Sequence, residues 1–208
     1  MESSDRPRII YFHGFGSSGA SGTVDSLRRL LPECEVLAPD IPVDPQEALP
    51  FLKEFCREQQ PDLVIGTSMG GMYAQQMFGF RKICVNPAFN MSHMSKVLKT
   101  GTHKFFNGRK DNAKEFTITR ETIQHFNMME RAQFKDITDF DRENTWGLFG
   151  IHDDQVNCYD LFKKYYNEAV LYTMSICRNE ALAEDITAET FMKAIKNYGK
   201  FRKDCRVE

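Results

Sequence analysis

The sequence predicts an α/β fold, in which a parallel sheet is flanked by helices, and three observations support this prediction. Short apolar runs alternate along the chain with amphipathic stretches, as strands and helices do in βαβ units. A glycine-rich loop follows the first apolar run. The third apolar run breaks at a serine between glycines and passes directly into a helix-compatible stretch.

The first predicted unit runs from a strand through a helix to a second strand. Residues 9–12 form a short apolar run that is typical of a buried strand, and the glycine-rich loop 13–19 follows it. Residues 23–31 place apolar side chains on one side of a helix, and 35–38 is the second strand. The pair Pro39-Asp40 closes that strand.

The following elements continue the alternation. Residues 46–57 form a second amphipathic helix, and 63–65 is an apolar strand. A helix is predicted for 69–80, a fourth strand for 82–85 and a fifth for 145–149. Strands that alternate with helices in this way favour a parallel sheet with right-handed crossovers.

Two regions depart from the alternation. Residues 86–142 are polar with scattered aromatics and no clear period, which predicts a lid-like insertion or a set of short helices within a domain of residues 1–160. Residues 161–208 carry apolar side chains at spacings of three and four, which is typical of packed helices. No strand pattern follows Val156, so we expect the sheet to lack its last strand and a helical hairpin to end the chain.

Composition restricts the class of protein. Hydrophobic residues make up 41% of the chain and charged residues 27%, as in soluble globular proteins. A net charge of −2 gives no electrostatic reason to expect nucleic-acid or membrane binding. The six cysteines include no Cys-x-x-Cys pair, so we expect reduced thiols and neither a zinc site nor a compact disulfide framework. No cofactor or metal is expected. Without a signal peptide or membrane-spanning run, a cytoplasmic location is expected.

The segment Gly66-Thr67-Ser68-Met69-Gly70 is the most informative motif in the chain. Gly-x-Ser-x-Gly after a buried strand is the nucleophile elbow, in which a tight strand-to-helix turn presents the serine. Ser68 is therefore the predicted nucleophile, and the backbone N–H of Met69 is the predicted first donor to an oxyanion. The alternative is an ordinary glycine turn between a strand and a helix.

The loop after the first strand supplies the second predicted oxyanion donor. It begins His13-Gly14-Phe15-Gly16, and the N–H of Phe15 or of Gly16 could donate. We interpret His13 as an imidazole that binds nearby backbone and orients this loop, because the base comes last in chain order in this fold.

The sequence offers two candidates for the acid of the triad and no histidine at the position expected for the base. Asp153 follows the fifth strand at the position expected for the acid, with Asp154 as the alternative one residue on, and an Asx turn as the structural alternative. The last histidine is His152, which adjoins the acid, so the expected late histidine is missing. The other three candidates for the base lie in the insertion: His93, His103 and His125.

Residues 7–166 resemble the YqiA-type esterase-like family of α/β-hydrolases. The resemblance rests on Ile-Ile-Tyr-Phe-His-Gly-Phe-Gly-Ser-Ser (9–18), Gly-Thr-Ser-Met-Gly-Gly (66–71), Val-Asn-Pro-Ala (85–88) and Gly-Ile-His-Asp-Asp-Gln-Val (150–156). It implies a small hydrolase of short esters or thioesters without a metal. It also implies a Gly-Gly-His-like segment after the acid, which this sequence lacks.

The tail resembles a different family. The runs 165–172 and 183–195, the second containing Ala-Glu-Asp-Ile-Thr-Ala-Glu-Thr-Phe, are similar to the start of region 2 of an extracytoplasmic-function sigma factor. The resemblance covers residues 160–206 and implies contact with RNA polymerase through 161–206. Direct DNA binding is not expected, because the chain stops before the helix that would open promoter DNA. The alternative for this segment is a generic amphipathic helix that packs on the sheet.

Three hypotheses follow for function. The first is a serine hydrolase that acts on a small acyl ester through an acyl-serine intermediate, with weak activity because its triad is incomplete. The second is a sigma-like segment that binds RNA polymerase and is carried on an inert hydrolase scaffold. The third is a non-functional hybrid, since the two resemblances meet within residues 161–167, where a natural fusion would have a flexible linker.

Overall fold

The computed structural model describes residues 6–149 except 95, 96 and 136, together with 173–179, 182, 183 and 186. The chain divides into two compact units, one formed by 1–133 with 138–149 and the other by 134–137 with 150–208. In the second unit the described segment Thr173–Cys177 is helical. The predicted boundary at residue 160 and most of the predicted helical hairpin lie outside the described residues.

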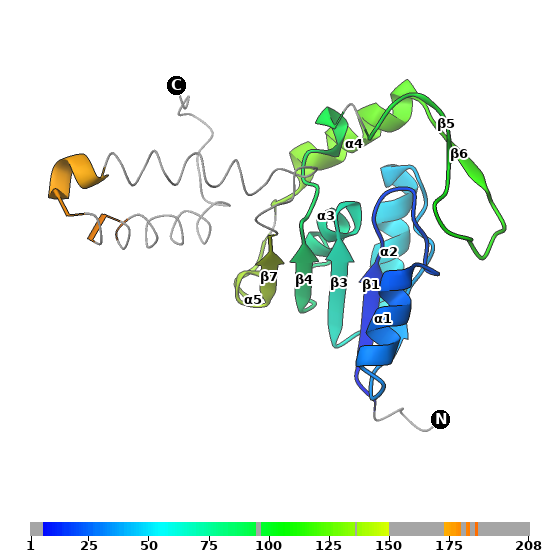
Figure 1. The fold of residues 1–208 in the computed structure, drawn as a ribbon, viewed down its shortest axis with the longest axis horizontal. Helices are drawn as coiled ribbons and strands as arrows, with labels where there is room; N and C mark the ends of the chain where they lie inside the picture. Colours follow the sequence, from blue (N-terminus) through cyan, green and yellow to red (C-terminus); the bar gives the residue numbers. More distant parts are fainter. Residues whose placement is uncertain are drawn as a thin grey trace. The chain divides into compact units, whose positions relative to one another are not determined.

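A parallel sheet of five strands forms the centre of the first unit, as predicted (Figure 1). Its order is β2-β1-β3-β4-β7, and every neighbouring pair is parallel. The strands are β1 (Arg8–Phe12), β2 (Glu35–Leu37), β3 (Leu63–Thr67), β4 (Lys82–Val85) and β7 (Thr145–Leu148). Phe12 lies opposite Gly66 in the register, so the segments that follow β1 and β3 leave the sheet at the same edge.

Helices connect these strands. They are α1 (Gly22–Leu30), α2 (Pro45–Gln59), α3 (Met69–Gln75), α4 (Arg120–Ala132) and α5 (Asp139–Glu143), with a 3₁₀ turn η1 (Met91–His93). Helices α1, α2 and α3 begin within one residue of the starts predicted at 23, 46 and 69. Asp44 caps α2 by accepting a hydrogen bond from the N–H of Gln46, and Pro45 begins the helix where no N–H is needed. None of the described helices has the length and apolarity that a bilayer crossing requires.

The predicted helix 69–80 was too long, because α3 ends at Gln75. Backbone groups after Gln75 form hydrogen bonds to side chains outside the helix. The carbonyl of Met77 accepts from Lys82, and the N–H of Gly79 donates to Asp141. Gly79 also has a φ of +83°, which a continuing helix does not allow.

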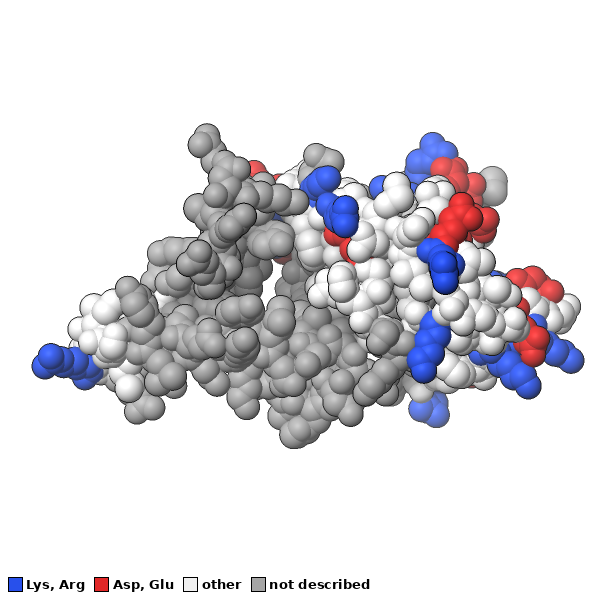
Figure 2. Space-filling model, turned by 90° about the horizontal axis from the view of Figure 1, so that it is seen from above, with Lys and Arg blue, Asp and Glu red and all other residues white. Residues whose placement is uncertain are grey.

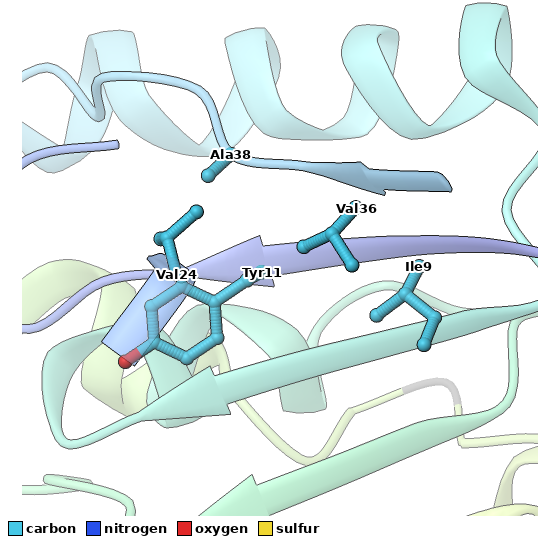
Figure 3. Close-up of a cluster of buried hydrophobic side chains, with 5 residues drawn as sticks. All are labelled: Ile9, Tyr11, Val24, Val36 and Ala38. Carbon is cyan, nitrogen blue, oxygen red and sulfur yellow. The ribbon is translucent and has the colours of Figure 1, made fainter. Parts of the chain in front are cut away.

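Helix α1 covers one face of the sheet with apolar side chains. Figure 3 shows the cluster at this contact, which consists of Ile9, Tyr11, Val24, Val36 and Ala38. Alternate residues of β1 point to opposite faces, and the other face carries Ile10 and Phe12, both fully buried. Since β1 is covered on both sides, it reads as one continuous apolar run in the sequence.

The insertion is more regular than the sequence indicated. It contains a two-stranded antiparallel hairpin, β5 (Gly101–Lys104) with β6 (Glu115–Ile118), and then the long helix α4. The prediction of a lid-like insertion or short helices therefore missed the two strands. These strands are mostly exposed, so no burial pattern marks them in the sequence.

Strand β7 is an edge of the described sheet, and it is poorly covered. The chain's one tryptophan, Trp146, keeps 50% of its surface exposed, and Leu148 keeps 55%. Residues 150–172 lie outside the described residues, so the expectation that the last strand is missing remains a prediction. An uncovered edge of this kind is open to pairing with another strand.

A buried ion pair links β4 to α5. The ammonium of Lys82 lies 2.6 Å from Oδ1 of Asp141, and the two side chains are only 1% and 2% exposed. Asp141 also accepts hydrogen bonds from the N–H of Gly79 and from the side chain of Thr138. Burial acts to raise the pKa of Asp141, but these hydrogen bonds and the Lys82 charge outweigh it and hold the pKa below its usual value.

We predict that breaking this pair destabilises the fold strongly. Asp141→Asn leaves a buried ammonium without its partner, and loss of one member of a buried pair costs about 3–5 kcal/mol. Urea unfolding measures the loss. Glu54→Gln, which breaks the exposed pair with Arg57, is the matched control and should cost less than about 1 kcal/mol. Equal effects of the two variants would contradict the prediction.

Acid should also remove the contribution of the Lys82–Asp141 pair to the free energy of unfolding, because it protonates Asp141. Because the folded pKa of Asp141 lies below 3.8, the pair stabilises the fold fully above that pH and loses its effect as pH falls through the folded pKa. Urea unfolding at pH values of about 5 and about 3 should show a larger loss in the unaltered chain than in Asp141→Asn. Parallel losses in the two proteins would mean that other carboxylates dominate acid unfolding.

Candidate active site

Ser68 sits on a strained turn between β3 and α3. Its φ and ψ are 56° and −119°, a backbone conformation that L-residues rarely adopt. Its N–H donates to the carbonyl of Val85 at 2.9 Å, and its own carbonyl accepts from Met72 at 3.1 Å and from Ala88 at 3.0 Å. The serine backbone is thus fixed by α3 and by the segment 85–88.

Glycines make this turn possible because backbone atoms approach each other too closely for a side chain. A Cβ on Gly66 would lie 2.1 Å from the carbonyl oxygen of Gly70, and one on Gly70 would lie 2.1 Å from that of Phe12. At Gly71 a Cβ would meet Pro87 at 3.1 Å. The elbow therefore packs directly on the end of β1 and on the segment after β4.

The Ser68 side chain is partly exposed, and its hydroxyl bonds to none of the described residues. The N–H of Met69, the first residue of α3, is buried and likewise donates to no acceptor in the described part of the chain. A buried N–H without an acceptor is uncommon in folded proteins. It lies at the position where the elbow is expected to bind an oxyanion.

The loop after β1 lies against the serine. A Cβ on Gly14 would be 3.6 Å from Cβ of Ser68 and 3.7 Å from the carbonyl oxygen of Thr67. Within this loop the N–H of Ser17 donates to Gly14, whereas the N–H groups of Phe15 and Gly16 find no acceptor among the described residues. The structure thus brings the predicted residues 13–16, 68 and 69 together at the end of the sheet where β1 and β3 finish.

His13 is buried and bonded to backbone on both sides. Nε2 accepts the N–H of Ile41 at 3.0 Å, so the proton of the neutral ring resides on Nδ1, which donates to the carbonyl of Gly14 at 2.9 Å. Burial lowers the pKa of His13, and the charge of Arg109 adds to this effect, while the hydrogen bond to Gly14 opposes it. With both nitrogens occupied, the ring holds the loop and has no free nitrogen for Ser68.

The histidines of the insertion have partners of their own. His93 lies 3.2 Å from Oγ of Ser92, and His103 lies 2.6 Å from the carbonyl oxygen of Lys99. His125 on α4 places Nδ1 2.8 Å from a carboxylate oxygen of Asp44. Among these three, only His125 has the carboxylate on Nδ1 that orients a catalytic base.

Asp153, Asp154 and His152 lie outside the described residues, so their predicted roles remain predictions. The structure adds a polar residue that the sequence interpretation missed. Asp40, after β2, accepts the N–H of Gly19 at 2.8 Å and that of Lys110 at 2.7 Å. In sequence it was only half of a Pro-Asp turn signal, which says nothing about its distant partners.

Figure 2 shows charged side chains of both signs on the described part of one face. Lys and Arg lie there among Asp and Glu, and uncharged residues cover the remaining described surface.

The parallel sheet and the strained serine turn define an α/β-hydrolase-like fold. The chain belongs to the family described as uncharacterised protein family UPF0227, whose model matches residues 8–168. This range contains the segments that suggested the YqiA-type resemblance. The sigma factor resemblance of residues 160–206 gains no support from the family match, and it remains a prediction from sequence. No curated protein matches the chain.

Several solved structures are similar to this chain at low sequence identity. The ferulic acid complex of Est1E from Butyrivibrio proteoclasticus has a TM-score of 0.46 and 11% identity, and the match covers 83% of this chain and 91% of that one. A carboxylesterase structure from Nitrososphaera gargenis has a TM-score of 0.42 and 14% identity, with 95% and 94% covered. A thioesterase domain of the curacin biosynthetic pathway has a TM-score of 0.42 and 12% identity, with 79% and 92% covered.

We predict that the elbow glycines are required for folding. Gly70→Ala forces a Cβ into the Phe12 carbonyl, and overpacking of this kind costs about 1–3 kcal/mol or more. Gly22→Ala is the matched control because a Cβ there has nothing within 4 Å. Thermal unfolding followed by circular dichroism compares the two variants. Equal melting temperatures for the two would contradict the geometry of the elbow.

Proposed function

We propose that this protein is a serine hydrolase that cleaves carboxylic esters or thioesters through an acyl-serine intermediate. One observation carries the proposal: the partly exposed Ser68 lies against the loop at Gly14, and the backbone N–H groups of Met69, Phe15 and Gly16 have no acceptor among the described residues. Preorganised N–H donors of this kind stabilise the charge that develops on a carbonyl oxygen during acyl transfer.

The proposed reaction has two halves. Oγ of Ser68 attacks the carbonyl carbon, a base takes the hydroxyl proton, and the carbonyl oxygen becomes an oxyanion bound by the N–H groups. The intermediate collapses, the bond to the alcohol or thiol breaks, and the leaving group takes the proton from the base. Water then attacks the acyl-serine in the same way and releases the acid and free Ser68.

The acid of the proposed triad is Asp153, with Asp154 as the alternative, and both follow from sequence alone. His13 cannot be the base because both of its nitrogens are bound, and residues 155–208 contain no histidine. Without a base, the oxyanion hole and substrate binding alone give a residual acceleration of about 10³–10⁴-fold over water. We therefore propose weak activity unless His125 or His152 serves.

Covalent labelling by a fluorophosphonate tests the proposal. We expect slow labelling of the unaltered chain and none of Ser68→Ala, because the probe forms its bond with the Ser68 hydroxyl. Labelling of His125→Asn and His152→Asn, followed over time, shows which ring takes the proton. Equal labelling of the unaltered chain and Ser68→Ala, or none of either, would overturn the proposed function.

A further inference from the structure

The hairpin of the insertion is bonded to the loop beside Ser68 at several points. The N–H of Phe106 donates to the carbonyl of Gly16 at 2.7 Å. The hydroxyl of Ser17 donates to Oδ1 of Asn107 at 2.9 Å, and that of Ser18 donates to the carbonyl of Gly108 at 2.8 Å. Three successive residues of the loop are therefore tied to three successive residues between β5 and β6.

Asp40 joins the same two segments through its two carboxylate oxygens. Oδ1 accepts from the N–H of Gly19, at the end of the loop beside Ser68, and Oδ2 accepts from the N–H of Lys110, in the hairpin. The neighbouring residue Ile41 donates its N–H to His13 and accepts from Arg109. Residues 40–41 thus link both ends of the loop to the hairpin.

These bonds affect the N–H groups of Phe15 and Gly16, which have no acceptor in the described part of the chain. Loop 13–19 contains three glycines, and glycine loses more conformational freedom on folding than any other residue. Without external contacts such a loop would sample many conformations, and an oxyanion donor works only if it is oriented before the reaction. The Gly16 carbonyl held by Phe106 fixes the peptide unit immediately after the N–H groups of Phe15 and Gly16.

We propose that Asp40 and the hairpin loop 105–110 are positioning elements for the oxyanion donors, so that the insertion is a fixed part of the site. This inference rests on the proposed function and assigns a task to residues that no motif includes. The ring of Phe106 also lies against the loop, because a Cβ on Gly16 would be 3.0 Å from it.

The test compares Asp40→Asn with Asp62→Asn in the full chain. The asparagine at position 40 keeps one acceptor and loses the other, so one of its two N–H partners is released. Asp62 is the matched control because its carboxylate also accepts a backbone N–H, that of Arg8 at 2.7 Å, at the start of β1. Asn107→Ala is a second variant, and it removes the acceptor of Ser17.

Two measurements are made on each variant. Amide hydrogen exchange over residues 13–20 should become about tenfold faster in Asp40→Asn and in Asn107→Ala and should be unchanged in Asp62→Asn. Fluorophosphonate labelling of Ser68 should show a maximal rate about ten- to a hundredfold lower in the same two variants, since a displaced donor costs up to about a hundredfold. The probe concentration at half-maximal rate should be unchanged, which separates positioning from binding.

Each other outcome has a distinct meaning. Unchanged exchange in Asp40→Asn and Asn107→Ala would overturn the inference, because loop 13–19 would then keep its conformation without these two contacts. Faster exchange with an unchanged labelling rate would also overturn it, since the loop would then not serve Ser68. If the unaltered chain shows no Ser68-dependent labelling, the proposed function fails and the catalytic role of Asp40 fails with it, whereas the exchange data still decide whether Asp40 fixes the loop.

Discussion

The contact that most of this structure depends on is the approach of three backbones at the serine turn. Gly70 lies against the carbonyl of Phe12, and Gly66 against that of Gly70, at distances that exclude any side chain. This contact sets how closely the start of α3 packs against β1 and β3, and so it sets the position of Ser68. It also fixes the start of the loop after β1, because β1 and β3 are in register at Phe12 and Gly66. Strain at Ser68 is tolerated because the packing around it is rigid.

The central sheet and the serine turn could be predicted from the sequence because each requires particular residue types at particular positions. A buried parallel strand such as β1 needs apolar side chains on both faces, and the turn needs glycine where backbones touch. The helix α4 was also marked, by Thr119 as its cap and by Thr122, Phe126 and Met129 at spacings of four and three, but the polar residues around them obscured this pattern. The hairpin carried no signal because its strands are exposed and its bonds are long-range.

Side chains whose partners are distant in sequence explain the rest of what was missed. Lys82 begins a strand, where a lysine is expected to be exposed. It is buried because Asp141, 59 residues later, accepts a hydrogen bond from its ammonium and balances the positive charge. Asp40 in the same way resembles a turn residue until the hairpin is placed beside it. Such pairs form only in the tertiary fold. A single sequence therefore shows which residue is present at a position but not which distant partner it has.

The exposed edge strand has a consequence for how this protein can be observed. Trp146 is the only tryptophan, and it lies half-exposed on β7, in register with Ile83 of the neighbouring strand. The tryptophan fluorescence of the chain, excited selectively, therefore reports the local environment of β7 and not that of the serine turn. Fraying of this strand alone changes the emission, so an unfolding curve recorded by fluorescence need not coincide with one recorded by circular dichroism.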